Sequence, residues 1–402
     1  MTSEWHEVPL RELVGYISKG IAPSYAEEAS ETTIRVLNQK CNRNFRISYG
    51  DSRLHDTLKK KVPPERYVKP DDILINSTGA GTAGRIAQIE DVPSATTIDG
   101  HMILIRSNGK VTQKFLGYAL KAHQWEVLQL DEGSTGQTEL NRDRLLDEIM
   151  INYPVSFDEQ NAIVGTLESI DRKLIVNEQL NDNLEQQAQA IYHERFETVS
   201  PNDLPSDWRI VTLGEVATIS NKSFNPLKEP EILLEHYSIP AFDEARFPVF
   251  ELSTSIKSNK FIIDASCFMI SKLNPTTKRV WKPYCLTGNA VCSTEFIVYK
   301  AKDQSITDFL YSVIDSGSFS DFMCSHVTGS TGSRQRTTPS DTLSYELILP
   351  SEDELAEFQS LVSPMYAQMR INAIENDKLK RLRDSLLPKL MSGEIDVSAV
   401  QL

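Results

Sequence analysis

The sequence predicts an α+β protein in which two mixed α/β domains are joined by two long helices, with the helices paired as an antiparallel coiled coil of pseudo-twofold symmetry. Three observations predict this fold: an internal repeat, two segments with a heptad pattern, and short β-prone runs between them. The pattern W-x-x-V-x-L-x-x-[LV] begins at Trp5 and returns at Trp208, and each copy precedes a globular and then a helical segment. A repeat on this scale indicates a duplicated architecture.

Two more landmarks support the duplication. Gly-Ser-Thr-Gly occurs at residues 133–136 and again at 329–332, and an apolar run ending in proline occurs at 151–154 and again at 347–350. Both pairs are separated by 196 residues. Their shared order and spacing predict two similar halves that carry out similar tasks.

Composition limits the class of protein. A chain of 402 residues, 40% of them hydrophobic, is long enough to form two or more domains. No apolar run approaches the roughly 20 residues that span a membrane, and the first residues lack the basic and apolar regions of a signal peptide, so we expect a soluble, intracellular protein. The five cysteines include no C-x-x-C pair, which argues against a disulfide framework or a zinc site.

The net charge of −14 is unevenly distributed along the chain. Residues 1–153 carry 19 Lys and Arg against 21 Asp and Glu, and residues 200–350 carry 14 against 17. The other nine excess negative charges lie on residues 154–199 and 351–402. Local basic faces on the nearly balanced segments can therefore still bind DNA, although we expect weak binding by this chain alone.

The two helical segments alternate spacings of four and three between seam residues, which is the pattern of a coiled coil. The first seam consists of Ile163, Leu167, Ile170, Leu174, Asn177, Asn181, Leu184, Ala188 and Ile191. The second, 195 residues later, consists of Phe358, Val362, Met365, Met369, Asn372, Asn376, Leu379, Arg383 and Leu386. The alternative is two ordinary amphipathic helices, each packed on its own domain. Pro364 favours that alternative because proline kinks a helix.

Two asparagines lie at the middle of each seam, Asn177 and Asn181 in the first and Asn372 and Asn376 in the second. In an antiparallel pair these polar layers meet. We expect them to set the register, since buried asparagine costs stability but fixes how helices align. The seam from Ile163 to Ile191 is about 42 Å long at roughly 1.5 Å per residue, comparable to the one DNA turn that separates half-sites read on one face.

Short apolar runs at residues 261–263, 267–270 and 295–299 predict strands, and residues 113–129 and 306–322 are expected to be helical. Residues 72–78 predict a strand before the glycine-rich residues 79–84. This glycine run formally matches a dinucleotide fingerprint and is close to a P-loop. Both of those sites require a helix after the glycines, whereas residues 85–93 predict a second strand and a turn. We therefore interpret the run as a hairpin that carries Arg85.

The sequence contains none of the catalytic motifs that we sought. It lacks the Asn/Asp-Pro-Pro-aromatic motif of amino-methyltransferases, a G-x-S-x-G elbow, an H-E-x-x-H pair and a metal-spaced cluster of His and Cys. We therefore expect no catalytic residues, no metal site and no cofactor on this chain.

Four segments carry a resemblance to a known family: the motif at Trp5 with residues 16–21, the hairpin at 73–85, residues 268–275 with 279–281, and the terminal residues 382–395. With these motifs the chain resembles, over essentially its whole length, the specificity (S) subunit of type I restriction-modification systems. The second half lacks the glycine-rich run of the first. That difference suits the reading of a different DNA sequence by each half.

The resemblance implies a non-catalytic, DNA-binding subunit of a cytoplasmic prokaryotic restriction system. It divides the chain into a first target recognition domain (residues 1–153), a central spacer helix (154–199), a second target recognition domain (200–350), and a C-terminal spacer helix and tail (351–402). Each recognition domain is expected to bind one part of a bipartite asymmetric site in double-stranded DNA. Two adenine-methyltransferase (M) subunits and restriction-translocase (R) subunits are the expected partners, and S-adenosylmethionine, ATP and Mg are expected on them alone.

The candidate DNA-binding residues are basic, amide and hydroxyl side chains, because these groups read base edges and contact phosphates. In the first half they are Arg43, Arg46, Lys59, Lys60, Lys61, Thr82, Arg85 and Gln137. In the second half they are Lys272, Lys278, Arg279, Lys282, Arg334, Gln335 and Arg336. The alternative for each is a solvated surface charge, and residues 59–61 can form a loop tip.

Three other functions stay open. The chain can serve a methylation-only system, which the sequence does not separate from a full restriction complex. A coiled-coil adaptor binds proteins but no defined DNA sequence. An enzyme that binds a nucleotide at residues 79–84 requires the helix that the following residues do not predict.

Overall fold

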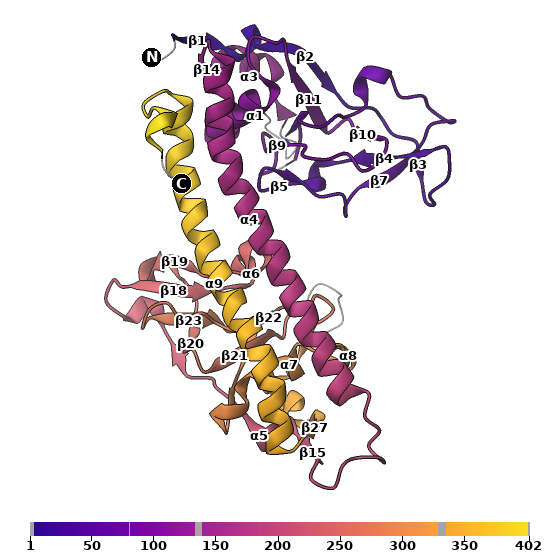
Figure 1. The fold of residues 1–402 in the computed structure, drawn as a ribbon, viewed down its shortest axis with the longest axis vertical. Coiled ribbons are helices and arrows are strands. Elements are labelled where there is room, and N and C mark those ends of the chain that lie inside the picture. The colour runs from indigo at the N-terminus through magenta and orange to yellow at the C-terminus, as the bar shows by residue number, and fades with distance from the viewer. Residues whose placement is uncertain (1–3, 80, 133–138, 329–334, 401–402) are drawn as a thin grey trace. The chain divides into compact units, whose positions relative to one another are not determined.

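The computed structural model describes residues 4–79, 81–132, 139–328 and 335–400, and its contacts divide the chain into two compact units (Figure 1). The first unit contains Met1–Lys173 and Lys380–Leu402, and the second contains Leu174–Leu379. Each unit therefore combines a β-rich part with segments of two long helices. Among the described residues, no helix has the length and apolar character needed to cross a membrane.

The first unit contains two four-stranded sheets and three two-stranded ribbons among its described residues. One sheet has the order β2 (Val14–Lys19), β11 (Met102–Ser107), β8 (Ile73–Asn76) and β9 (Ile86–Gln88). The other has the order β10 (Thr96–Ile98), β4 (Thr33–Leu37), β7 (Arg53–Asp56) and β3 (Tyr25–Ala26). The ribbons are β1 (Trp5–Pro9) with β14 (Met150–Pro154), β5 (Asn42–Arg43) with β6 (Arg46–Ile47), and β12 (Asp131–Glu132) with β13 (Glu139–Leu140).

Among the described residues before α4 (Phe157–Tyr192), three α-helices accompany these strands: α1 (Gln113–Ala122), α2 (Gln124–Val127) and α3 (Arg142–Glu148). The single helix expected over residues 113–129 is interrupted at His123. The physical reason is that the side chain of Gln124 bonds the backbone of Gly84 and Ile86, which turns the chain across the end of β9.

The second unit repeats this organisation. A sheet of order β16 (Ala217–Ile219), β24 (Phe296–Ala301), β21 (Cys267–Ser271) and β22 (Val280–Trp281) corresponds to the sheet that contains β8 and β9. The ribbon of β15 (Arg209–Thr212) with β27 (Glu346–Leu349) corresponds to that of β1 with β14. A five-stranded sheet has the order β17 (Ser223–Phe224), β20 (Lys260–Ile262), β23 (Ala290–Ser293), β18 (Leu233–Tyr237) and β19 (Val249–Leu252), and β25 (Val327–Thr328) pairs with β26 (Arg336–Thr337).

The helices of the second unit's β-rich part are α5 (Leu213–Val216), α6 (Ile239–Ala245), α7 (Thr307–Ile314) and α8 (Gly317–Ser325). The helix expected over residues 306–322 is divided because Ser316 caps α8, its side chain accepting from Phe319 N. The hairpin interpretation of residues 73–89 is confirmed, since β8 and β9 pair antiparallel. No helix opens at the glycines, which leaves the dinucleotide and P-loop patterns without their required context.

Two long helices complete the fold, α4 (Phe157–Tyr192) and α9 (Glu352–Met391). They run antiparallel: in the first unit Leu167 of α4 shares a core with Leu387 of α9, and in the second unit Ala188 shares one with Phe358. Pro364 does not end α9, and it lies on the exposed face of that helix. The helices thus pair with each other as well as with their β-rich parts, and the predicted fold class is confirmed.

Candidate nucleic-acid interface

Basic residues are concentrated where acidic ones are missing. In a chain with 56 Asp and Glu, residues 32–50 contain none but carry Arg35, Lys40, Arg43 and Arg46. Residues 265–294 also contain none and carry Lys272, Lys278, Arg279 and Lys282. Such stretches form local basic surfaces on an acidic protein, and DNA phosphates are attracted to surfaces of this kind.

In the first unit the acid-free stretch forms a tight hairpin, β5 with β6, in which Arg43 lies opposite Arg46. The two connecting residues, Asn44 and Phe45, have φ values of 52° and 61°. Two left-handed residues are the signature of a type I′ turn, which matches the twist of paired strands. Phe45 is held by a bridge to Ala87 and by the Lys121 ammonium 5.0 Å from its ring centroid. Arg43 and Asn44 are exposed, and Arg46 is half-buried.

This hairpin is bonded to the glycine-rich loop between β8 and β9. Asn42 donates to Asn76 Oδ1 at 3.2 Å and to Arg85 O at 2.8 Å. Asn76 in turn donates to Gln39 O at 3.2 Å. The segments that carry Arg43, Arg46, Thr82 and Arg85 are therefore joined into one surface.

The loop itself needs its glycines. A Cβ on Gly84, whose φ is +85°, would lie 2.9 Å from Val127 O, and one on Gly79, whose φ is +111°, would lie 2.3 Å from Thr82 Oγ1. Thr82 bonds the carbonyl oxygens of Thr78 and Gly79 within the loop, at 3.4 and 3.3 Å. Arg85 is half-buried at the loop's end. The loop is a compact element that presents backbone and hydroxyl groups beside the hairpin.

Residues 59–61 follow β7 in the other sheet and have different neighbours. Lys59 forms an exposed ion pair with Asp56 at 3.8 Å, and Lys60 donates to Ala22 O at 2.8 Å. Lys61 is exposed. Within the described part of the chain, the contacts of Lys59 and Lys60 are with Asp56 and Ala22 and not with the hairpin, so these lysines stay a separate prediction. Gln137 lies outside the described residues, as does the Gly-Ser-Thr-Gly run at 133–136.

The sequence reasoning missed Trp125, which is 75% exposed. It follows Gln124, whose side chain donates to Gly84 O at 2.8 Å and accepts from Ile86 N at 2.9 Å. The indole therefore belongs to the helix that packs directly on the glycine-rich loop. A signal was available, because Trp125 stands between polar residues in the run His123-Gln124-Trp125-Glu126.

In the second unit the corresponding loop connects β21 with β22 and contains Asn274, whose φ is 49°. A bridge from Leu273 to Arg336 matches the bridge from Thr78 to Glu139 in the first unit. The two loops therefore occupy the same position in the duplicated fold. Lys272 and Gln335 are half-buried beside this loop, and Gln335 O accepts from Asn274 N at 2.9 Å. Arg334 lies outside the described residues.

The other basic candidates of the second unit are bound to acids. Arg279 is paired with Asp243 through two bonds of 2.6 and 2.9 Å, and Arg336 with Glu295 through two of 3.0 and 3.1 Å. Lys278 lies 2.8 Å from Asp315 Oδ1 and also donates to Asp315 O at 2.7 Å. Lys282 is paired with Asp308. The acids come from segments that are distant in sequence, so the sequence did not reveal these ion pairs.

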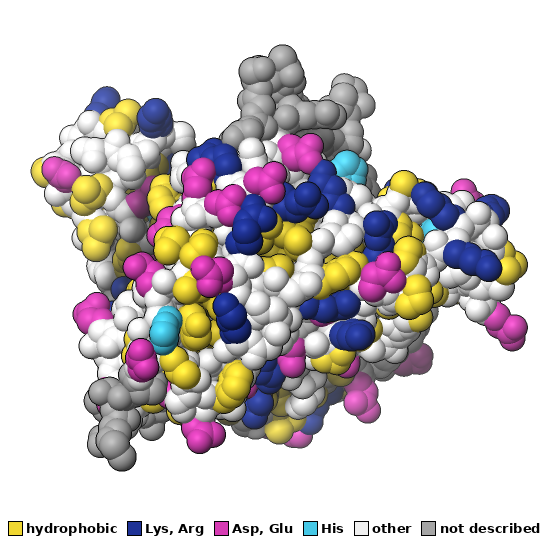
Figure 2. Space-filling model, turned by 90° about the horizontal axis from the view of Figure 1, so that it is seen from above, with side chains coloured by type: hydrophobic (Ala, Val, Ile, Leu, Met, Phe, Trp, Pro, Cys, Tyr) yellow, Lys and Arg dark blue, Asp and Glu magenta, His cyan; other side chains and the backbone are white. Residues whose placement is uncertain are grey.

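Burial raises the pKa of one of these acids, Asp315. Asp315 is 1% exposed, and its burial raises its pKa to about 6, against the lowering effect of Lys278. Arg279 is only 12% exposed in its side chain. Arg279 is thus a largely buried partner of Asp243, whereas burial makes Asp315 costly to ionise in spite of Lys278. Figure 2 shows Lys and Arg side chains interspersed with acidic and hydrophobic ones on the face that it presents.

The predicted register asparagines meet across the helix pair. Asn177 donates to Asn376 Oδ1 at 2.9 Å and to Glu375 Oε2 at 2.7 Å. Asn372 donates to Asn181 Oδ1 at 2.8 Å. The side-chain amides of the other two asparagines donate to helix carbonyl oxygens. Asn181 donates to Met369 O at 3.2 Å, and Asn376 donates to Leu174 O at 3.3 Å.

A charged cluster occupies the helix pair in the first unit. Asp171 of α4 accepts from Tyr118, Lys121 and Arg383, each at 2.9 Å. Burial raises the pKa of Asp171, but Lys121 and Arg383 outweigh it, so that its pKa lies below the ordinary value. The equivalent position in the repeat is Tyr366, whose hydroxyl bonds Ser312 at 2.7 Å. The two units therefore attach to the helices through different chemistry.

The described residues contain no group of three or more His, Cys, Asp or Glu that could hold a metal ion. The five cysteines are all unpaired, and three of them are buried. The first unit offers a basic hairpin beside its glycine-rich loop, which suits recognition of a polyanion, whereas four basic candidates of the second unit are paired with acids.

The comparisons with known proteins agree with this chemistry. The family described as "Type I restriction modification DNA specificity domain" matches residues 2–186. The specificity subunit of the type I restriction enzyme MjaIX of Methanocaldococcus jannaschii is 25% identical over 381 residues, covering 87% of this chain and 83% of that protein. The specificity subunit of the HindI enzyme of Haemophilus influenzae is 32% identical over 93 residues, covering 23% and 20%.

A solved structure is similar in fold. The type I restriction-modification S subunit from M. genitalium aligns over 97% of this chain and 96% of that chain, with a TM-score of 0.57 and 16% identity. At this identity the likeness concerns the fold alone.

Proposed function

We propose that the chain is a specificity subunit of a type I restriction-modification system, and that each of its two units reads one part of a bipartite DNA target; the match of residues 2–186 and the similarity to the MjaIX subunit support this. One observation carries this proposal. Each unit has a loop at the same topological position, between β8 and β9 and between β21 and β22, and an acid-free basic stretch beside or around it. Loops repeated at the same topological position are suited to two separate contacts with one nucleic acid, and the first of them lies beside the basic hairpin of Arg43 and Arg46.

The two half-sites are proposed to differ in sequence. After β4 the first unit has the hairpin of Arg43 and Arg46, whereas after β18 the second unit has helix α6, which is followed by Arg246. The side chains beside the two loops therefore differ in kind and position. Since base edges are read by specific side chains, different surfaces select different bases.

The paired helices are proposed to set the spacer between the half-sites. Helix α4 is continuous over 36 residues, and the asparagine layers allow one alignment of α4 with α9. A shift by one heptad would leave these amides opposite other seam residues, most of them apolar, which costs free energy because buried polar groups need partners. A fixed register gives a fixed length, which is the property that a spacer requires.

Catalysis is proposed to belong to partners: two adenine-methyltransferase subunits that use S-adenosylmethionine, with restriction-translocase subunits that use ATP and Mg in a full restriction complex. The chain itself is proposed to act in the cytoplasm without a cofactor. Its role is to select the DNA at which the methyltransferase acts.

The experiment is reconstitution of methyl transfer. Labelled S-adenosylmethionine and unmodified genomic DNA are incubated with the methyltransferase alone, the chain alone, and both together. We expect stable methylation only with both. Transfer by the chain alone would contradict the division of labour, and methyltransferase activity that is unaffected by the chain would favour the coiled-coil adaptor.

A further inference from the structure

Two adjoining cavities lie in the second unit, between helices α7 and α9 and the segment that follows β22. They have volumes of about 480 and 510 Å³ and share Ala265, Lys282, Asp308 and Ser363 in their walls. Volumes of this size are typical of small-molecule sites.

The cavity of about 480 Å³ is aromatic. Its walls include Trp281, Tyr284, Tyr311 and Tyr366, with Met369 beside them. Flat rings of this kind provide faces on which another planar ring can stack. The cavity is therefore suited to an aromatic or heteroaromatic group.

Two polar groups in this wall lack a hydrogen-bond partner among the described residues, and one of them is Trp281 Nε1, which is buried. Tyr311 is 4% exposed, and within the described part of the chain no hydrogen bond to its hydroxyl is formed. Two comparable tyrosines in this unit are satisfied: Tyr366 bonds Ser312 at 2.7 Å and Tyr299 bonds Thr342 at 2.6 Å. Buried polar groups are nearly always hydrogen-bonded, and an exception calls for a missing ligand or water.

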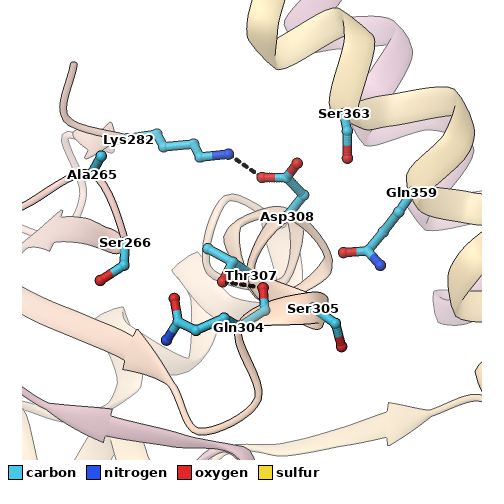
Figure 3. A pocket seen from close by; sticks show the side chains of 9 residues that line it. All are labelled: Ala265, Ser266, Lys282, Gln304, Ser305, Thr307, Asp308, Gln359 and Ser363. Carbon is cyan, nitrogen blue, oxygen red and sulfur yellow. Dashed lines mark hydrogen bonds and ion pairs between the residues drawn. The ribbon is translucent and has the colours of Figure 1, made fainter.

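The cavity of about 510 Å³ has different walls. Figure 3 shows Gln304, Ser305 and Thr307 across from Gln359 and Ser363 of α9, with Lys282 pointing toward Asp308. Hydroxyl and amide groups of this kind both donate and accept hydrogen bonds. Together with the carboxylate of Asp308, they match the hydroxyl groups of a sugar.

We propose that the joined cavities bind a free nucleoside or mononucleotide, with the base against the aromatic rings and the sugar among the hydroxyl and amide groups. The Tyr311 hydroxyl bonds a polar atom of the base, and Asp308 accepts from a sugar hydroxyl. Arg370 stands at the aromatic cavity, where it donates to Tyr284 O at 3.2 Å. It is available to a phosphate when the ligand carries one. Apart from Lys282, the walls of the two cavities contain none of the candidate DNA-binding residues.

The test is calorimetric titration of the full-length chain with adenosine, AMP and a single-stranded oligonucleotide of deoxyadenosine. Tyr311→Phe removes only the hydroxyl. Because that hydroxyl has no protein partner, we expect the melting temperature of the free chain to stay the same or rise, while the affinity for adenosine and AMP falls about fivefold or more. Arg370→Gln should lower the affinity for AMP more than the affinity for adenosine. Lys378→Gln, on the same helix but away from the cavities, should lower neither affinity.

Three results would overturn the proposal. The first is no heat of binding with adenosine or AMP at millimolar concentration, and the second is equal affinity of the wild type and Tyr311→Phe. The third is an effect of Tyr311→Phe on the oligonucleotide but not on adenosine, which would assign the cavity to a base of a DNA strand.

Discussion

The side-chain amide of Asn177 donates to the side-chain oxygen of Asn376 at 2.9 Å across the helix pair. The duplication relates Asn177 to Asn372 and Asn181 to Asn376, and the second layer joins Asn372 to Asn181 at 2.8 Å. The two layers are therefore related by the repeat itself. Each satisfies polar groups that are buried between α4 and α9.

We expect Asn177→Leu to destabilise the chain by about 1–3 kcal/mol, because it leaves the oxygen of Asn376 buried without a donor. The double change Asn177→Leu with Asn376→Leu should recover most of this loss, since two leucines replace the polar pair. Urea denaturation of the wild type, both single variants and the double variant measures the coupling. Asn183→Leu on the exposed face of α4 is the control. A single variant as stable as the control would show that the layer contributes nothing.

Asp171 is expected to be critical to the first unit. Asp171→Asn removes the carboxylate that Lys121 contacts and leaves Arg383 with only the exposed Asp384, at a cost of roughly 3–5 kcal/mol. Asp384→Asn is the matched control, because Asp384 also contacts Arg383 but is 63% exposed in its side chain. The folded pKa of Asp171 is lowered, so its contribution is present above the ordinary pKa and is lost as the pH falls through the folded value. Equal thermal stability of the two variants at pH 7 would contradict this assignment.

Asp315 gives the opposite dependence on pH. Its pKa is about 6 in the folded chain against an ordinary value of 3.8, so the folded state binds the proton more tightly. The free energy of unfolding should therefore fall as the pH rises from about 4 through 6. The Asp315→Asn variant cannot ionise at this position. Its free energy of unfolding relative to that of the wild type should therefore increase by up to roughly 3 kcal/mol between pH 4 and pH 8. Denaturant titrations at both pH values test this, and a pH-independent difference would refute it.

Arg43 and Arg46 are predicted to contact DNA. In the assembly with the methyltransferase, replacing one phosphate-binding arginine by alanine should lower the slope of log affinity against log salt by about 0.9. Arg279→Ala is the control of the same residue type. It breaks the ion pair with Asp243, so it should lower stability rather than the salt slope. If both arginine variants of the hairpin keep the wild-type slope, the hairpin does not contact phosphate.

Much of the fold could be predicted from the sequence, because it rests on periodic patterns. The heptad seams gave both long helices, and the alternation after Gly84 gave the β8–β9 hairpin. Pro364 misled because a proline on the exposed face of a long, packed helix need not end it. The helix break at His123 depends on hydrogen bonds from Gln124 to backbone that is distant in sequence, and the break at Ser316 depends on a helix cap. Neither break was predicted.

The candidate site was harder to predict, because charge in a sequence does not show what neutralises it. Arg279 and Arg336 are of a residue type that commonly binds DNA. They are paired with Asp243 and Glu295, however, which lie far away in the chain. Arg43 and Arg85, by contrast, lie on segments that side-chain amides join. Which basic residues contact DNA stays a prediction for both units.

If each unit reads one half of a split site, the two parts of the methylated motif should depend on different units. Long-read methylome sequencing measures this in cells that carry the wild-type gene, a deletion, or the double variant Arg43→Ala with Arg46→Ala. We predict an N6-methyladenine motif in two parts that disappears on deletion and, in the double variant, is lost or relaxed in only one of its parts. A methylome unchanged by the deletion, with the gene and its methyltransferase both expressed, would show that the chain does not select the methylated sequence.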